Sequence, residues 1–225
     1  RPNLDRLLDA RAREWPDRRF LVWVPFEGEA KTWTYRQFAR DAARLAGGLA
    51  KRGIGPGDRV LLHFENCPET LLVRFALARL GAVCVATNAM AAGPEIKHYA
   101  ESSGAVAAIT QASFVDTVAS HARGVRFVVA AGGYGADSLD ALYAEPAAAS
   151  LAKDTDTAAI MFTTGTTGKP KGVVWTHANV LWGRRYSAQV YGHRHDDVSL
   201  ISLPLFHVVG LCWSFLPVLW AGGTA

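Results

Sequence analysis

The sequence has 225 residues, half of them hydrophobic, so the chain is long enough to bury a substantial core. Its 24 Lys and Arg residues against 20 Asp and Glu residues give a net charge of +4 without a basic block, which argues against a nucleic-acid partner. Three distant cysteines, Cys67, Cys84 and Cys212, fit neither a disulfide framework nor a zinc site. They predict reduced, buried thiols and a cytoplasmic protein.

The ends of the sequence and its longest apolar run bear on targeting. The first residues are charged and helical in pattern, so no signal peptide is expected. The apolar run 208–220 is too short to span a bilayer and contains Gly210 and Pro217, so no transmembrane segment is expected. The sequence starts without Met and stops where a strand is about to begin, so we expect it to be part of a longer polypeptide.

The first 58 residues predict a helix, a hairpin and a second helix. Residues 4–14 have an amphipathic pattern that ends near Pro16. Two strands, 20–24 and 31–35, flank a turn and predict the hairpin. Thr34 and Gln37 have the spacing of a capping box, which predicts the start of the second helix.

From residue 59 onward, short apolar strands alternate with helices. The predicted strands are 59–64, 83–86, 105–110, 125–130, 158–162, 173–175 and 198–203. The predicted helices are 68–80, 94–102, 113–122, 139–143, 176–191 and 208–220. This alternation predicts an α/β fold with parallel-rich sheets flanked by helices on both faces.

A loop rich in hydrogen-bond donors, residues 163–172, follows the predicted strand 158–162. Glycines allow backbone N–H groups to approach a ligand, threonines add hydroxyls, and lysines add positive charge. These residues are Thr163, Thr164, Gly165, Thr166, Thr167, Gly168, Lys169, Lys171 and Gly172. Because the loop contains no acidic residue, its composition favours a polyphosphate ligand.

Two other kinds of loop are alternatives to this phosphate site: a flexible surface turn and the P-loop of nucleotide hydrolases. A flexible surface turn has a similar composition, although so many donors without an acid are unusual there. The P-loop of nucleotide hydrolases needs G-x-x-x-x-G-K-[ST] and a following helix. Here Gly165 and Gly168 are too close together, Pro170 follows the lysine, and a strand comes next.

Residues 163–172 resemble the signature phosphate loop of adenylate-forming enzymes, which include acyl-CoA synthetases, peptide-synthetase adenylation domains and luciferases. They match the pattern [ST]-[ST]-G-[ST]-[ST]-G-x-P-K-G at every position. Residues 204–210 resemble a second family motif, P-L-F-H-x-x-G. Segments 63–69, 174–179 and 203–207 look most like the carnitine/crotonobetaine-CoA ligase branch of bacterial acyl-CoA ligases.

The resemblance implies roles for individual residues. It places His207, with Phe206 and Gly210, at the carboxylate-substrate pocket, whereas a lone histidine is more often a core-edge residue with one hydrogen bond. Lys171 is a better candidate than Lys169 for neutralising pyrophosphate. No catalytic residue and no metal ligand is expected within residues 1–225. The predicted ATP-phosphate ligands are Thr163, Thr164, Gly165, Thr166, Thr167, Gly168, Lys169 and Lys171.

The function implied by the resemblance is an ATP-dependent carboxylic acid–CoA ligase. The expected partners are a small carboxylic acid, ATP with Mg²⁺, and CoA as co-substrate, and a homodimer is one expected assembly. Residues 1–225 are expected to form the front portion of the large N-terminal AMP-binding domain. Alone they are expected to be inactive, because the family's adenine segment, ribose-binding Asp and C-terminal catalytic Lys find no match. The alternatives are an adenylation domain that loads a carrier protein and a non-catalytic nucleotide-binding remnant.

Overall fold

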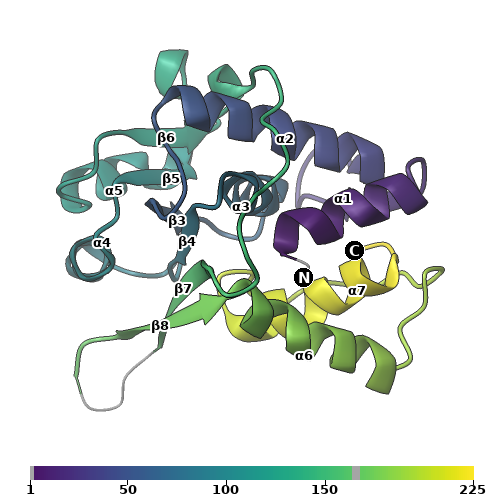
Figure 1. The fold of residues 1–225 in the computed structure, drawn as a ribbon. Coiled ribbons are helices and arrows are strands. Elements are labelled where there is room, and N and C mark those ends of the chain that lie inside the picture. Colours follow the sequence, from purple (N-terminus) through teal and green to yellow (C-terminus); the bar gives the residue numbers. More distant parts are fainter. Residues whose placement is uncertain (1–2, 164–167) are drawn as a thin grey trace.

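The structure is a computed structural model, and it describes residues 3–163 and 168–225. Its larger sheet has the strand order β6-β5-β3-β4-β7-β8 (Figure 1). Its strands are β3 (Arg59–His63), β4 (Val83–Ala86), β5 (Ala107–Gln111), β6 (Val128–Ala131), β7 (Thr157–Thr163) and β8 (Lys171–Thr176). All neighbouring strands in this sheet pair in parallel except β7 and β8, which form an antiparallel hairpin.

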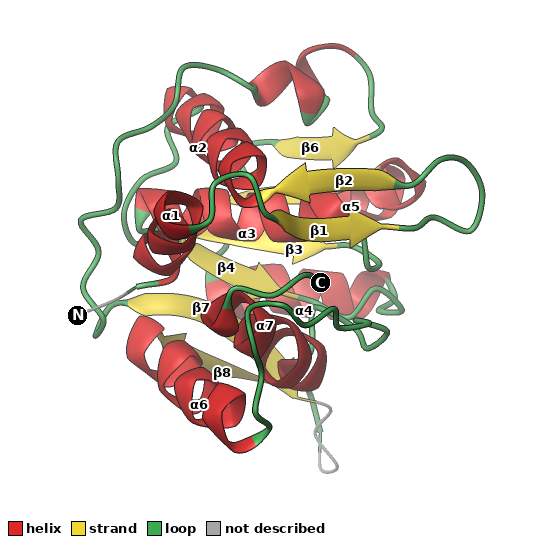
Figure 2. Ribbon diagram, turned by 90° about the vertical axis from the view of Figure 1, so that its right-hand side faces the viewer, coloured by secondary structure: helices red, strands yellow, loops and turns green. Residues whose placement is uncertain are grey.

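A small second sheet lies near the N-terminus. Strands β1 (Arg19–Trp23) and β2 (Lys31–Thr34) pair antiparallel, as the sequence predicts. Ala225 lies beside β1 (Figure 2) and exchanges two main-chain hydrogen bonds with it, from its own N–H to Phe20 O and from Val22 N–H to its carbonyl. The hairpin therefore joins segments about 200 residues apart in the sequence.

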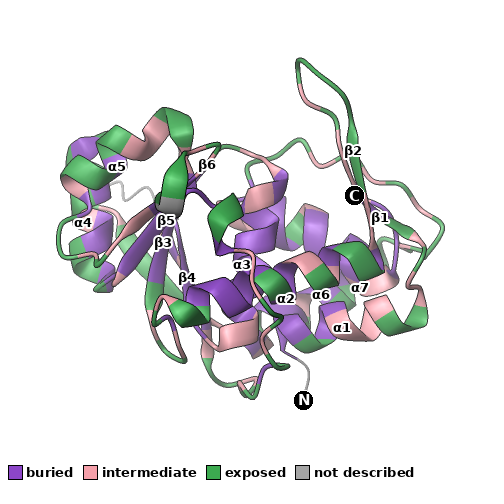
Figure 3. Ribbon diagram, turned by 90° about the horizontal axis from the view of Figure 1, so that it is seen from above, coloured by how far each residue is buried: buried purple, intermediate pink, exposed green. Residues whose placement is uncertain are grey.

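Helices cover both faces of the larger sheet. Helices α4 (Gly93–Ser103) and α5 (Val115–His121) lie on one side, and the others lie on the opposite side (Figure 3). The others are α1 (Leu4–Glu14), α2 (Tyr35–Lys51), α3 (Pro68–Leu80), α6 (His177–Val190) and α7 (Leu216–Ala221). The fold is thus the predicted α/β fold, and no described helix has the length and apolar character needed to cross a membrane.

Each face of the sheet has its own hydrophobic core. Side chains alternate along β3, so Val60 and Leu62 join the core beneath α2 and α3, whereas Leu61 joins the core beneath α4 and α5. The first core also holds Cys84 and Cys212, as expected for buried thiols, whereas Cys67 is only half-buried at its edge. These two cores fix both helical layers against the sheet, and so fix the loops at its edges.

Most predicted elements are confirmed, including the hairpin, the helix 4–14 and the helix 68–80. Gly81 ends α3 in the left-handed conformation at φ +68°, and Thr34 forms the predicted capping box with Gln37. A second capping box joins Thr176 and Asn179 at the start of α6. The sixth strand is displaced, to Val128–Ala131 from the predicted 125–130.

One prediction near the C-terminus is wrong. The strand predicted at 198–203 is absent, because only an isolated bridge joins Val198 to Thr224 and the side chain of Leu200 is 91% exposed. The helix predicted at 208–220 is confirmed, although its first part, Val209–Phe215, is π-helical and only its last part, α7, is α-helical. Pro217 lies in the first turn of α7, directly after the π-helical part.

Two histidines, His63 and His177, are buried, and each has a hydrogen bond to its ring. His63 donates from Nδ1 to the Thr87 hydroxyl over 2.9 Å, because that hydroxyl itself donates to Leu62 O. His177 accepts the Leu4 N–H on its Nδ1 over 3.3 Å. Burial, which disfavours the charged imidazolium, lowers the pKa of each histidine to about 4.

We therefore expect the free energy of unfolding to fall as the pH drops from about 6.5 to about 4. Between pH 6.5 and pH 4 the histidines of the unfolded chain bind protons, whereas those of the folded protein stay unprotonated. Their contribution to the free energy of unfolding is therefore fully present above pH 6.5 and is lost as the pH falls. The loss amounts to roughly 3 kcal/mol per histidine at full protonation. Urea unfolding at pH 7, 6 and 5 measures it, and His63→Asn, which keeps a donor for Thr87, should reduce the slope. Equal stability at pH 7 and pH 5 would contradict the expectation.

Candidate functional site

Strands β3, β4 and β7 end at the same edge of the sheet, because they run parallel. Open α/β sheets bind ligands beyond the carboxyl ends of their strands, where the chain connections change direction. That change occurs at β3, since α3 leads to β4 on one side of it and α4 leads to β5 on the other. The loop 163–172 leaves β7 at this edge, as the phosphate-site hypothesis requires.

The described part of the loop consists of Thr163 and residues 168–172. Strands β7 and β8 pair up to Thr163 and Lys171, and the Thr163 hydroxyl donates to Lys171 O over 3.4 Å. Lys169 and Lys171 are both exposed, so their ammonium groups are accessible to a ligand. The other four predicted ligands lie outside the described residues: Thr164, Gly165, Thr166 and Thr167. Their phosphate contacts stay predictions.

The two described glycines of the loop differ in what they do. Gly168 has φ +152°, a backbone angle that residues with a side chain rarely adopt. This is the special backbone angle that was expected of a glycine in this loop. Gly172 has no positive φ, so the expectation of a special backbone angle there is wrong. A Cβ at Gly172 would instead lie 2.9 Å from Ile160 Cγ2 and 3.4 Å from the Phe162 ring. The absence of a side chain at Gly172 therefore leaves room for the side chains of Ile160 and Phe162 to pack over β8.

The second motif forms a tight turn that exposes its histidine. His207 N–H bonds Pro204 O over 3.1 Å, and His207 Nδ1 accepts the Val209 N–H over 3.3 Å. In the neutral ring this leaves the proton on Nε2, which is therefore a donor. Gly210 is buried, and a Cβ there would lie 2.1 Å from Pro204 O. Phe206 is half-buried against the main core.

Asn66 connects the loop after β3 to the second motif, and the sequence left it within an unassigned loop. It follows β3, and its amide donates to Leu203 O over 2.9 Å while its carbonyl accepts the Leu205 N–H over 2.8 Å. These two bonds hold the chain just before His207 at the same sheet edge as the phosphate loop. The sequence signal was an amide in the loop that follows a buried strand, but its partners are more than 130 positions away.

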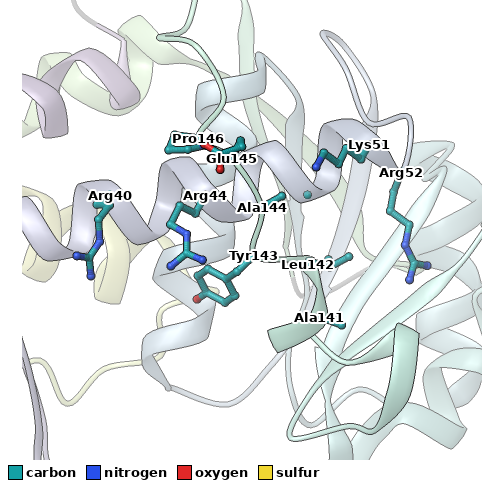
Figure 4. Close-up of a pocket in the computed structure, with 11 residues that line it drawn as sticks. Arg40, Arg44, Lys51, Arg52, Ala141, Leu142, Tyr143, Ala144, Glu145 and Pro146 are labelled. Carbon is teal, nitrogen blue, oxygen red and sulfur yellow. The ribbon is translucent and has the colours of Figure 1, made fainter.

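A groove of about 1050 Å³ lies over α2, away from the motif residues (Figure 4). Three of its cations have partners: Arg40 pairs with Asp41 at 3.2 Å, Arg52 pairs with Asp137 at 2.9 Å, and the Arg44 guanidinium lies over the Tyr143 ring at 5.8 Å. Since no residue of either motif lines this groove, we do not assign it to the site. Nor do the described residues contain a group of three or more His, Cys, Asp or Glu side chains placed to hold a metal ion.

Comparison with known sequences supports the motif assignment. The profile of the family described as AMP-binding enzyme matches residues 8–225. The chain is 33% identical over 236 residues to the crotonobetaine/carnitine–CoA ligase of Salmonella paratyphi A, covering 99% of this chain and 46% of that protein. It is 38% identical over 191 residues to the feruloyl-CoA synthase of an Amycolatopsis species, covering 85% of this chain and 38% of that protein. The chain thus spans less than half the length of these curated relatives.

Solved structures show the same fold. A putative long-chain-fatty-acid CoA ligase from Rhodopseudomonas palustris superimposes with a TM-score of 0.89 at 28% identity, over 99% of this chain and 56% of that one. The O-succinylbenzoate coenzyme A synthetase of Bacillus subtilis, solved in complex with AMP, gives a TM-score of 0.84 at 28% identity, over 100% and 55% of the two chains. With the family profile matching nearly the whole sequence, the chain belongs to the AMP-binding family of adenylate-forming enzymes.

Proposed function

We propose that this chain forms the front part of the N-terminal domain of a cytoplasmic, ATP-dependent carboxylic acid–CoA ligase. The observation that carries the proposal is the hairpin loop 163–172, which matches the family's phosphate-loop pattern and leaves β7 at the ligand-binding edge of the sheet. The relatives named as crotonobetaine/carnitine–CoA ligase and feruloyl-CoA synthase support a small carboxylic acid as substrate.

The proposed reaction has two steps. The carboxylate of the acid attacks the α-phosphate of ATP, forming an acyl-adenylate and releasing pyrophosphate. The thiol of CoA then attacks the acyl carbon, forming a thioester and releasing AMP. Negative charge builds up on pyrophosphate in the first step, so fixed donors and cations next to it lower the barrier.

The described residues have the chemistry for the phosphate side of this reaction. Thr163 offers a hydroxyl, and the exposed Lys169 and Lys171 offer ammonium groups that can reach phosphate oxygens. On the carboxylate side, the exposed His207 presents Nε2–H as a donor. A donor in this position suits an acyl-adenylate oxygen better than it suits proton abstraction.

The same residues do not fit a magnesium ion. Mg²⁺ prefers carboxylate oxygens and water, whereas the described part of the loop offers hydroxyl, amide N–H and ammonium groups. We therefore propose that Mg²⁺ enters with ATP and is held by its phosphates and by residues beyond these 225. For the same reason we propose that the chain alone does not complete the active centre.

Acid-dependent ATP–pyrophosphate exchange on the full-length protein tests the proposed function. The panel holds carnitine, crotonobetaine, ferulate, and short, medium and long fatty acids, with amino acids as a contrasting class. Exchange with one class of acid, followed by thioester formation and AMP release when CoA is added, is the expected result. A folded protein that binds ATP but exchanges with no acid would refute the ligase assignment.

A further inference from the structure

Helix α4 lies beside the β7–β8 hairpin (Figure 1) and contacts it on both sides of the phosphate loop. On the entry side, the Phe162 ring packs against Tyr99 with ring centroids 4.3 Å apart. On the exit side, His98 Nε2 lies 2.8 Å from Pro170 O. His98 also meets the Phe162 ring edge-to-face at 6.0 Å, so two consecutive helix residues touch both ends of the loop.

The chemistry of the His98 contact fixes its direction. A carbonyl oxygen only accepts hydrogen bonds, so His98 Nε2 must carry the hydrogen and donate it. The half-buried ring has this donor aimed at the main chain and away from solvent. Its helix is anchored, because Ile96, Tyr99 and Ala100 are buried in the core beneath α4 and α5. His98 therefore holds the loop exit against a fixed part of the fold.

The Pro170 carbonyl belongs to the peptide bond that joins Pro170 to Lys171, the lysine proposed to bind the ATP phosphates. A peptide unit is planar, so the oxygen of Pro170 and the nitrogen and Cα of Lys171 move as one rigid group. A hydrogen bond that fixes the oxygen thus also orients the base of the Lys171 side chain. Donors that stabilise developing charge act only when they are held in place beforehand, and a displacement of about 1 Å can cost about 100-fold in rate.

We propose that His98 is a positioning residue for adenylation, acting through the Pro170 carbonyl to orient Lys171. This inference rests on the proposed function, because it takes Lys171 as a ligand of the ATP phosphates. His98 itself does not contact the reacting groups. A glutamine side chain has a similar length and an amide N–H, so it should be able to donate the same hydrogen bond in place of the imidazole.

Three variants of the full-length protein test the inference. His98→Ala should lower kcat for ATP–pyrophosphate exchange about 10-fold, with a smaller change in KM for the acid and a Tm within about 3 °C of the parent. His98→Gln should recover most of the rate through its amide N–H. Lys97→Ala, an exposed neighbour on the same helix, is the matched control and should match the parent. Loss of rate in proportion to loss of Tm, or no recovery by glutamine, would overturn the positioning role.

A double-mutant cycle shows whether His98 acts through Lys171. If it does, His98→Ala should cause little further loss in a Lys171→Ala background. The same fold-loss in both backgrounds would overturn the inference. Hydrogen exchange of amides 168–176 is independent of activity and should be faster in His98→Ala but not in Lys97→Ala. Absence of acid-dependent exchange in the parent refutes the proposed function, whereas parental activity without a His98 effect refutes this inference alone.

Discussion

Replacing Lys171 with alanine is expected to lower acid-dependent ATP–pyrophosphate exchange by about 100-fold, while the Tm stays within about 2 °C of the parent. The side chain is exposed at the first residue of β8, and it has no ion pair within the described residues. Its removal therefore leaves the packing intact and takes away only a positive charge beside the loop. A loss of this size is typical when one preorganised charge-stabilising donor is removed.

Two further lysines make this result interpretable. Lys31 is also an exposed lysine at the first position of a strand, and Lys31→Ala should leave the exchange rate unchanged. Lys169→Ala should give a smaller loss than Lys171→Ala, because Lys169 lies within the loop and is not anchored by the β7–β8 ladder. A full rate in Lys171→Ala, or a fall in Tm that accounts for the lost rate, would reject its role at the pyrophosphate.

Gly210→Ala is expected to lower the free energy of unfolding by about 1 to 3 kcal/mol, the usual cost of overpacking. The new methyl carbon would lie 2.1 Å from Pro204 O and 2.6 Å from Leu203 O. Both are main-chain atoms held by neighbouring hydrogen bonds, so the turn itself must open. Because that turn presents His207, the apparent KM for the carboxylic acid should rise together with the loss of stability.

Gly183 provides the matched control for this substitution. It lies inside α6 with nothing within 4 Å of an added Cβ. Gly183→Ala should therefore raise stability by roughly 0.5 to 1 kcal/mol, through better helix propensity. Thermal unfolding of both variants, with acid titrations of the exchange reaction, measures the contrast. If Gly210→Ala were as stable as the parent, the close approach to Pro204 would not constrain the turn.

Local signals in the sequence predicted local structure well. The capping box at Thr34 and the apolar alternation depend on residues a few positions apart. The two motifs likewise predicted the family, because each is a short, contiguous pattern. The strand predicted at 158–162 was correctly placed, as Thr157–Thr163.

Features that depend on distant partners could not be predicted in this way. The segment 198–203 has a strand-like pattern, but the main-chain pairing recorded for it is limited to its first residues, which bond to Thr224. The hydrogen bonds of Asn66 and His98 are made to main-chain atoms 137 and 72 positions away. Gly172 matched the family pattern for a loop glycine, yet its missing side chain serves the packing of Phe162. Each of these results follows from the tertiary arrangement, which no short pattern encodes.

The hydrogen bonds between β1 and Ala225 can form only after the whole of this segment has been synthesised. During synthesis Val22 leaves the ribosome about 200 residues before its partner, a delay of roughly 10 to 40 s at about 5–20 residues per second. For that time the outer edge of β1 has unpaired N–H and C=O groups that another chain could bind. Premature pairing of this edge competes with correct folding, so slow translation or a high local concentration of nascent chains should lower the yield of native protein.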